Sequence, residues 1–237
     1  MILSFNIEYR TNWGEEVKLA GLSTESTPMY TTDGIYWTAE VELEVPQEGL
    51  TIHYSYQIEQ NGIVIRKEWN NFPRCLFLSG TPRKKYRIND CWKNIPEQLY
   101  LYSSAFTEAL LSHPEREDIP QGYKKGLIIK AYAPRINKDY CLAICGNQKA
   151  LGNWNPEKAV FMSDSNFPEW QVELDASKLK YPLEYKFILC HKQERKIGCW
   201  ERNPNRYLAD PEIKTNEMPI LIFQCGKVQE LPSPYFP

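Results

Sequence analysis

Two tryptophans in short polar loops are the residues of this chain best suited to chemistry. Residues 151–154 read Leu-Gly-Asn-Trp and end at Trp154, whereas residues 200–206 read Trp-Glu-Arg-Asn-Pro-Asn-Arg and begin at Trp200. A flat indole offers apolar area to the C–H face of a glucose ring and has little conformational entropy to lose. Neighbouring Lys, Glu and Asn side chains can hydrogen-bond to the sugar hydroxyls. The pattern therefore predicts a sugar platform and not a reaction centre.

The segment between these loops predicts the element that positions them. Residues 183–188 read Leu-Glu-Tyr-Lys-Phe-Ile, in which apolar and polar side chains alternate. Such alternation indicates a β-strand with one buried face. Glu184 and Lys186 then share the polar face of this strand.

These three stretches, in this order, resemble the binding site of the family 20 carbohydrate-binding modules, which bind starch. The resemblance implies that Trp154 and Trp200 are the two platforms for glucose rings. It also implies that Glu184, Lys186 and Asn205 hydrogen-bond the sugar. A site of this kind needs no cofactor.

The alternative for both tryptophans is a place in the core of a β-sandwich, where an isolated Trp usually lies. Trp37 and Trp170 stand within apolar alternation, and we interpret these two as core residues. Trp154 and Trp200 stand in loops rich in Asn, Pro and charged residues, which favours their exposure.

The chain repeats one β pattern. Residues 19–21 match residues 144–146 at an offset of 125 residues. Tyr54 matches Tyr185, and Trp69 matches Trp200, both at an offset of 131. Residues 37–43 match residues 170–174 at an offset of 133. The drifting offset indicates insertions in loops between matched strands. A long-period duplication of β segments predicts two copies of one all-β domain.

Each copy has about seven short strands, frequent turn residues and no long helix, which is typical of an immunoglobulin-like β-sandwich. We expect two tandem sandwiches joined by a short, partly helical linker. In that linker, residues 103–111 favour a helix with Ser104 as its N-cap. The expected parts are copy 1 at 1–90, the linker at 91–125, copy 2 at 126–224 and a tail at 225–237 leading to a catalytic domain.

The resemblance also implies a second site, which the family builds around Tyr-Gly-Glu and an aromatic residue ahead of the core Trp. Copy 1 has Trp-Gly-Glu at residues 13–15, which makes Trp13 the platform, and Tyr30 is its expected partner. Copy 2 has no aromatic residue in the aligned stretch 137–139, and only Phe167 could remain as a partial contact.

The first site of copy 1 is degraded by comparison with copy 2. Its loop at residues 22–26 is short and lacks Trp, and Ser55 replaces the lysine. Trp69 is the only platform expected to survive there, and the sequence leaves its exposed and buried interpretations equally open.

Composition excludes several classes of function. The net charge is −2 and the isoelectric point is near 6.0, which argues against a nucleic-acid partner. No apolar run is long enough to span a bilayer, so no membrane partner is expected. The N-terminus lacks the features of a signal peptide, and the seven cysteines are scattered and odd in number. Reduced thiols in the cytoplasm are the simplest interpretation.

The sequence shows no catalytic constellation. The three His residues lie far apart, no ligand spacing favours a metal, and no Gly-rich phosphate loop is present. A (β/α)₈ barrel needs roughly 250 residues and alternating helices. We therefore expect no catalytic residue, metal or cofactor in this chain.

Two tandem modules of this family followed by the tail at residues 225–237 resemble the start of amylomaltase-type 4-α-glucanotransferases of glycoside hydrolase family 77. That resemblance implies α-1,4-glucan or maltooligosaccharide as the partner and a catalytic domain in cis that moves glucosyl or maltosyl units. Two alternatives stay open, namely a glycogen-binding regulatory module of a phosphatase or kinase assembly, and a protein-interaction sandwich whose aromatic residues anchor an interface. Glucan binding separates the last alternative from the others.

Overall fold

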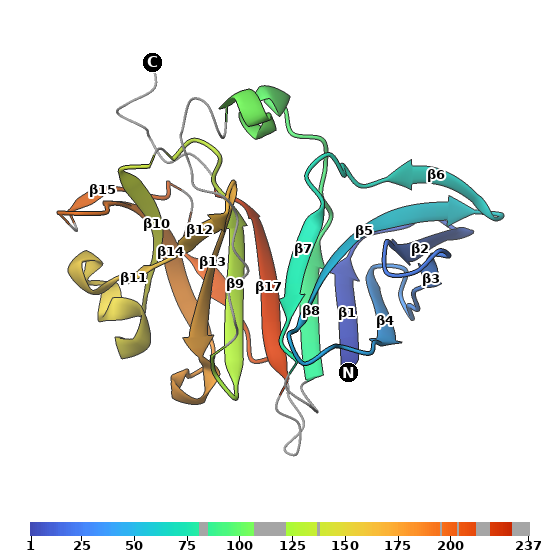
Figure 1. Ribbon diagram of the computed structural model, residues 1–237, viewed down its shortest axis with the longest axis horizontal. Helices are drawn as coiled ribbons and strands as arrows, with labels where there is room; N and C mark the ends of the chain where they lie inside the picture. Colours follow the sequence, from blue (N-terminus) through green and yellow to red (C-terminus); the bar gives the residue numbers. More distant parts are fainter. Residues whose placement is uncertain are drawn as a thin grey trace. The chain divides into compact units, whose positions relative to one another are not determined.

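In the computed structural model, the regular secondary structure of the described residues is nearly all β-strand, which confirms the expected all-β class (Figure 1). The structure describes residues 1–80, 85–106, 122–136, 138–194, 196–202, 204–211 and 219–228. Within these ranges, no helix is long and apolar enough to cross a membrane. Most of the expected linker helix at 103–111 and most of the tail at 225–237 lie outside the described residues.

The chain divides into two compact units. Unit 1 is built mainly from Met1–Leu99 with Pro219–Gln224, and unit 2 mainly from Gly122–Met218. Strand β17 (Ile220–Lys227) is divided between them after Gln224. The domain bounds expected from the sequence stay a prediction.

One sheet of unit 1 is centred on strand β1 (Ile2–Glu8). It pairs antiparallel with β4 (Tyr36–Glu42) and parallel with β8 (Lys85–Cys91), and the start of β17 pairs parallel with β8. Alternate residues of β1 are buried, as the period of two requires, because successive side chains point to opposite faces.

The other sheet of unit 1 is centred on the long strand β5 (Leu50–Gln60). Its remaining strands are β3 (Thr27–Pro28), β2 (Glu15–Ala20), β6 (Ile63–Lys67) and β7 (Arg74–Leu78). The inner faces of the two sheets meet where the ring of Phe5 lies edge-on to that of Tyr54, with centroids 5.0 Å apart. Unit 1 is therefore a β-sandwich.

Unit 2 repeats this arrangement. Its first sheet contains β9 (Gly126–Tyr132), β12 (Ser163–Asn166) and β13 (Glu169–Asp175). Its second sheet contains β10 (Tyr140–Gly146), β11 (Val160–Phe161), β14 (Leu183–His191), β15 (Ile197–Trp200) and β16 (Arg206–Leu208). Among the described residues of the whole chain, short 3-10 helices are η1 (Leu99–Tyr102), η3 (Lys149–Trp154), η4 (Pro156–Lys158) and η5 (Ala176–Lys178).

The two core tryptophans confirm the internal repeat. Trp37 and Trp170 are buried, as the sequence predicts. The indole N–H of Trp37 donates to the carbonyl of Tyr9 at 3.2 Å, and that of Trp170 donates to the carbonyl of Ala133 at 3.1 Å. In each unit, the core Trp is thus hydrogen-bonded to the backbone carbonyl of the residue just after the first strand.

A buried ion pair repeats as well, and it corrects one part of the predicted alignment. Glu68 and Arg74 of unit 1 make the same contacts as Glu201 and Arg206 of unit 2, including backbone bonds to Tyr56 and Phe187 respectively. The predicted pairing of Trp69 with Trp200 is therefore wrong, because Lys67, the residue before Glu68, occupies the position of Trp200. The separation between the backbone partner and the Glu is 12 residues in unit 1 and 14 in unit 2, so the hairpin of unit 2 is longer by two.

Candidate carbohydrate-binding site

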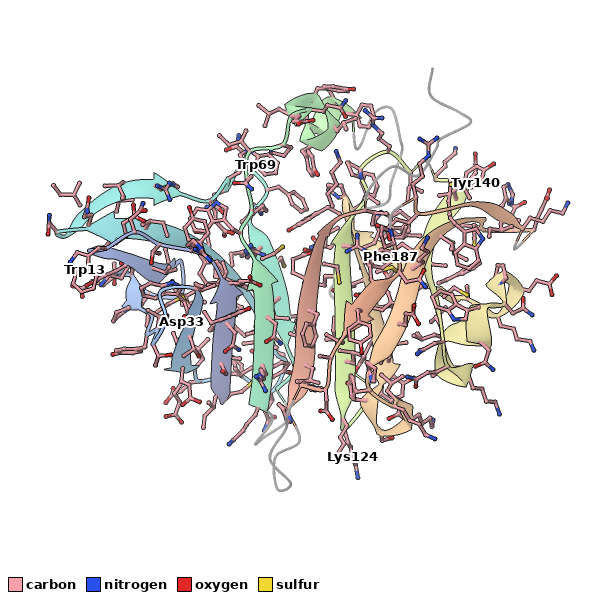
Figure 2. The ribbon with its side chains drawn as sticks, turned by 180° about the vertical axis from the view of Figure 1, so that it is seen from behind. Trp13, Asp33, Trp69, Lys124, Tyr140 and Phe187 are labelled. Atoms are coloured by element: carbon pink, nitrogen blue, oxygen red, sulfur yellow. The ribbon has the colours of Figure 1, made fainter. Side chains whose placement is uncertain are left out.

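The outer face of strand β14 carries the candidate site. The rings of Tyr185 and Phe187 point into the sandwich, where they lie edge-on to one another (Phe187 is labelled in Figure 2). Alternation along the strand therefore places Glu184, Lys186 and Ile188 on the opposite face. The sequence prediction that the two charged residues share one face is confirmed.

An apolar floor on this face supports the first tryptophan. Ile188 of β14 and Ala143 of β10 are paired residues and are fully buried, although both belong to the outer face. Trp200 is paired with Ile188 from the other side and so lies on the same face. Helix η3, which ends at Trp154, packs on β10.

The second tryptophan is held by an unusual backbone. Three successive residues have positive φ, namely Gly152 at 83°, Asn153 at 50° and Trp154 at 59°. A Cβ atom on Gly152 would lie 2.8 Å from the carbonyl oxygen of Lys158, so glycine is required there. The left-handed conformation costs an L-residue roughly 1–2 kcal/mol. Strain of this kind is typical of sites where a side chain must take one orientation.

The two indoles form one platform. Their ring centroids are 6.3 Å apart and their planes are inclined by 45°. Both side chains are half-buried, so each is supported from below and keeps one part open to solvent. The structure therefore brings together the two residues that the sequence predicts as platforms.

Hydrogen-bonding groups lie beside this platform. Asn205 Nδ2 donates to Glu184 Oε1 at 2.7 Å, and Lys186 Nζ donates to the backbone carbonyl of Glu201 at 3.2 Å. An ammonium group has three donors, and carboxylate and amide oxygens accept more than one hydrogen bond. Each of the three side chains can thus bind a sugar hydroxyl while keeping the contact that orients it.

The Glu201–Arg206 pair positions the site, and sequence reasoning missed this role. Arg206 donates from Nε and Nη2 to the carboxylate of Glu201, with the shortest distance 2.6 Å, and its guanidinium lies 4.9 Å from the ring centroid of Phe187. Burial acts to lower the pKa of Arg206, but hydrogen bonds and the charge of Glu201 outweigh it and raise that pKa. Glu201 follows Trp200 and Arg206 follows Asn205, so the pair fixes both ends of the loop. The repeated Glu and Arg in unit 1 were the signal available in the sequence.

The second candidate site, in unit 1, is built from two loops. Trp13 stands in a turn that Asn12 and Glu15 close, with Glu15 N–H bonded to Asn12 O at 3.1 Å, and its side chain is 100% exposed (Figure 2). Tyr30 is 69% exposed and precedes the loop that contains Gly34. Thr11 N–H donates to the carbonyl of Gly34 at 3.0 Å, which ties the two loops together.

The first site of unit 1 lacks its platforms. The backbone of Gly21 approaches that of His53 as Gly146 approaches Glu184, so His53 and Ser55 stand where Glu184 and Lys186 stand in unit 2. Trp69 is half-buried, and the ammonium of Lys93 lies 5.7 Å from its ring centroid. Figure 2 shows Trp69 well apart from Trp13. A role of Trp69 in glucan binding stays a prediction.

The expected partial contact by Phe167 of unit 2 is wrong. Phe167 is 4% exposed, and its ring lies edge-on to that of the core Trp170 with centroids 6.1 Å apart. The sequence places it next to a core residue, and packing against that residue accounts for its burial.

Comparisons with known proteins agree with this assignment. Residues 129–218 match the sequence model of the CBM_20 family, described as "Starch binding domain". The chain is 23% identical over 254 residues to the 4-alpha-glucanotransferase DPE2 of Oryza sativa subsp. japonica, in a match that covers 97% of this chain and 26% of the relative. It is 30% identical over 66 residues to Glucoamylase-1 of Schizophyllum commune, covering 28% of this chain and 11% of the relative.

Among solved structures, the family 20 module of the maltotetraose-forming amylase from Pseudomonas saccharophila STB07 is similar, with a TM-score of 0.35 and 18% identity. That match covers 43% of this chain and 98% of the module. The chain spans about a quarter of the length of the rice glucanotransferase.

The fold and the matched segment are those of a carbohydrate-binding module. Within that class, residues 129–218 match the starch-binding domain of family 20, and the chain is homologous to a plant 4-alpha-glucanotransferase. The matched segment contains Trp154, Glu184, Lys186, Trp200 and Asn205.

Proposed function

We propose that this chain binds α-1,4-glucan through the platform of Trp154 and Trp200. The observation that carries the proposal is the inclination of the two indole planes by 45° with ring centroids 6.3 Å apart. An α-1,4-linked chain curves, so its successive rings do not lie in one plane. Inclined platforms fit such a chain, whereas a flat β-1,4-linked chain fits coplanar aromatic rings.

The polar groups beside the platform suit a neutral, hydroxyl-rich ligand. Glu184, Asn205 and Lys186 present both donors and acceptors. Burying most of two indoles contributes roughly 1.5–3 kcal/mol each, from which ordering costs are subtracted. The expected dissociation constant is therefore about millimolar to tens of micromolar.

We also propose a second, separate contact with glucan in unit 1, through Trp13 and Tyr30. Trp13 is fully exposed at the tip of a turn, so its large apolar surface does not stabilise the fold. The hydrogen bond from Thr11 to Gly34 keeps the Trp13 loop beside the loop that follows Tyr30. Each unit then contributes one site, at different places on the repeated fold.

At the level of the whole protein, we propose that these modules deliver glucan to a 4-alpha-glucanotransferase domain in cis. The support is the 23% identity to the rice 4-alpha-glucanotransferase, which extends over 97% of this chain and covers 26% of that longer relative. We propose a cytoplasmic location, because none of the seven cysteines, all of which lie in the described residues, is part of a disulfide.

Isothermal titration calorimetry with maltoheptaose and β-cyclodextrin tests the glucan site. We expect Trp154→Ala and Trp200→Ala each to weaken binding by about tenfold or more, since each removes one platform. Tyr123→Ala serves as the matched control, because Tyr123 is an exposed aromatic residue of unit 2 outside the site. Cellohexaose, a flat chain, should not bind. If both tryptophan variants fold and bind like the wild type, the proposal is wrong.

A further inference from the structure

An exposed tyrosine lies in line with the candidate site. Tyr207 of β16 is paired directly with Glu184 of β14. Residues directly opposite in an antiparallel pair extend to the same face of the sheet. The ring of Tyr207 therefore stands on the face that carries Glu184 and Lys186, and its side chain is 66% exposed.

Tyr207 and Trp200 lie along the same edge of β14. Tyr185 pairs with Gly146 of β10 on one edge of the strand and with Arg206 of β16 on the other. Ile188 likewise pairs with β10 on the first edge and with Trp200 of β15 on the second. Strands β15 and β16 thus follow one another along one edge, with their aromatic residues on one face.

The spacing suits a ligand that passes from one aromatic residue to the other. Trp200 is opposite Ile188 and Tyr207 is opposite Glu184, so their partners lie four positions apart along β14. At about 3.3 Å per residue, this separation is roughly 13 Å. The hydrogen-bonding groups Lys186, Glu184 and Asn205 lie in the interval.

The backbone that carries Tyr207 is fixed before any ligand arrives. Its neighbour Arg206 is bonded to Glu201 and, through Nη1, to the carbonyl of Cys225 at 2.9 Å. The ring itself has only two side-chain torsions to order. A single exposed aromatic residue needs no functional explanation, so the argument rests on alignment with the site and on this rigid support.

We propose that Tyr207 is a third aromatic contact of the glucan site, stacking on a glucose unit farther along the chain than the one on Trp200. The proposal rests on the proposed function of that site. A contact with Tyr207 makes the site selective for the length of the glucan, because a short oligosaccharide bound to the tryptophan pair ends before it reaches Tyr207. A longer chain gains a further contact with no change in the tryptophan platform.

Calorimetry with two ligand lengths and three variants tests this assignment. We expect Tyr207→Ala to weaken maltoheptaose binding by roughly three- to tenfold and to leave maltose binding unchanged. Tyr207→Phe keeps the ring and should bind both ligands like the wild type. Trp200→Ala should weaken the binding of both ligands, because Trp200 belongs to the platform that both ligands occupy. Circular dichroism checks that each variant is folded.

The outcomes separate this inference from the proposed function. If Tyr207→Ala binds maltoheptaose like the wild type while Trp200→Ala does not, Tyr207 is no contact and the platform stands. If Tyr207→Ala weakens the binding of both ligands equally, the substitution acts by disturbing Glu184 and Asn205, and the proposed selectivity for chain length is wrong. If the wild type binds neither ligand, the glucan site itself is refuted.

Discussion

Glu201 and Arg206 form an ion pair in which Arg206 Nη2 lies 2.6 Å from Glu201 Oε1, the Glu201 side chain is sealed from solvent and that of Arg206 is half-buried. Each partner is the chain neighbour of a residue of the glucan site, Trp200 in one case and Asn205 in the other. Unit 1 keeps the equivalent pair of Glu68 and Arg74, also at 2.6 Å, although its own first site has lost its platforms. The pair is therefore a structural part of the repeated fold on which the unit 2 site is built.

Removal of one partner of this pair should destabilise unit 2. We expect Glu201→Ala to lower the free energy of unfolding by about 3–5 kcal/mol, because it leaves the guanidinium of Arg206 without its charged partner in a largely buried place. Glu201→Gln keeps the shape and part of the hydrogen bonding, so its cost should be smaller. Urea denaturation followed by tryptophan fluorescence measures both. Equal stability of Glu201→Ala and the wild type would show that the pair is not needed.

Substitution of Gly152 should damage the platform without touching an aromatic residue. Gly152→Ala must accept both a positive φ and a contact of 2.8 Å with the carbonyl of Lys158, so the turn that orients Trp154 has to shift. We expect a loss of about 1–3 kcal/mol in stability and a weaker affinity for maltoheptaose.

Gly62→Ala is the matched control for that change. Gly62 has a similar φ of 76°, but no atom would lie within 4 Å of the added Cβ. It should cost roughly 1 kcal/mol in stability and leave the affinity of the unit 2 site as it is. If both glycine variants bind maltoheptaose like the wild type, the shape of the η3 turn does not control the platform.

The elements of this fold were predictable wherever side chains alternate. Residues 183–188 have strong alternation, and the structure shows strand β14 with Glu184 and Lys186 on one face. Trp37 and Trp170 were predictable as core residues for the same reason, since each lies within the apolar alternation of a strand.

What could not be predicted depends on contacts between distant segments. The pairing of Trp69 with Trp200 failed because the two hairpins differ in length by two residues, which only the contacts of Glu68 and Glu201 show. The alignment of Tyr207 with the site was also hidden, because a tyrosine in a polar loop shows its direction only once its strand is paired with β14.

The stability of unit 1 should depend on pH through Asp90. Both Tyr54 and Tyr56 donate from their hydroxyls to Asp90 Oδ2, at 3.0 and 2.9 Å, and Arg74 Nη1 lies 3.1 Å from Oδ1. Burial raises the pKa of Asp90 above its usual 3.8; the charge of Arg74 acts against this shift, and the charge of Glu68 adds to it.

The sign of the effect follows from proton binding. Just above pH 3.8 the folded protein keeps a proton on Asp90 that the unfolded chain has lost, so the contribution of this group to stability falls as pH rises through the folded pKa. Asp90→Asn carries no such proton. We expect the free energy of unfolding of the wild type, relative to that of Asp90→Asn, to be greater at about pH 4 than at about pH 7. Urea denaturation at both values measures this difference, and an increase with pH would contradict the prediction.

Binding to insoluble glucan should use one site from each unit at the same time. Trp13 of unit 1 and Trp154 of unit 2 belong to different sites, and two weak sites in one chain can engage one long or branched glucan with an avidity greater than either affinity. In a pull-down on starch granules or glycogen, we expect a partial loss for Trp13→Ala, a partial loss for Trp154→Ala and a near-complete loss for the double variant. Trp13 is not part of the unit 2 site, so Trp13→Ala should leave the binding of short maltooligosaccharides to that site unchanged. Tyr100→Ala, which removes an exposed aromatic residue outside both sites, is the control. If Trp13→Ala changes nothing in either background, only unit 2 binds glucan.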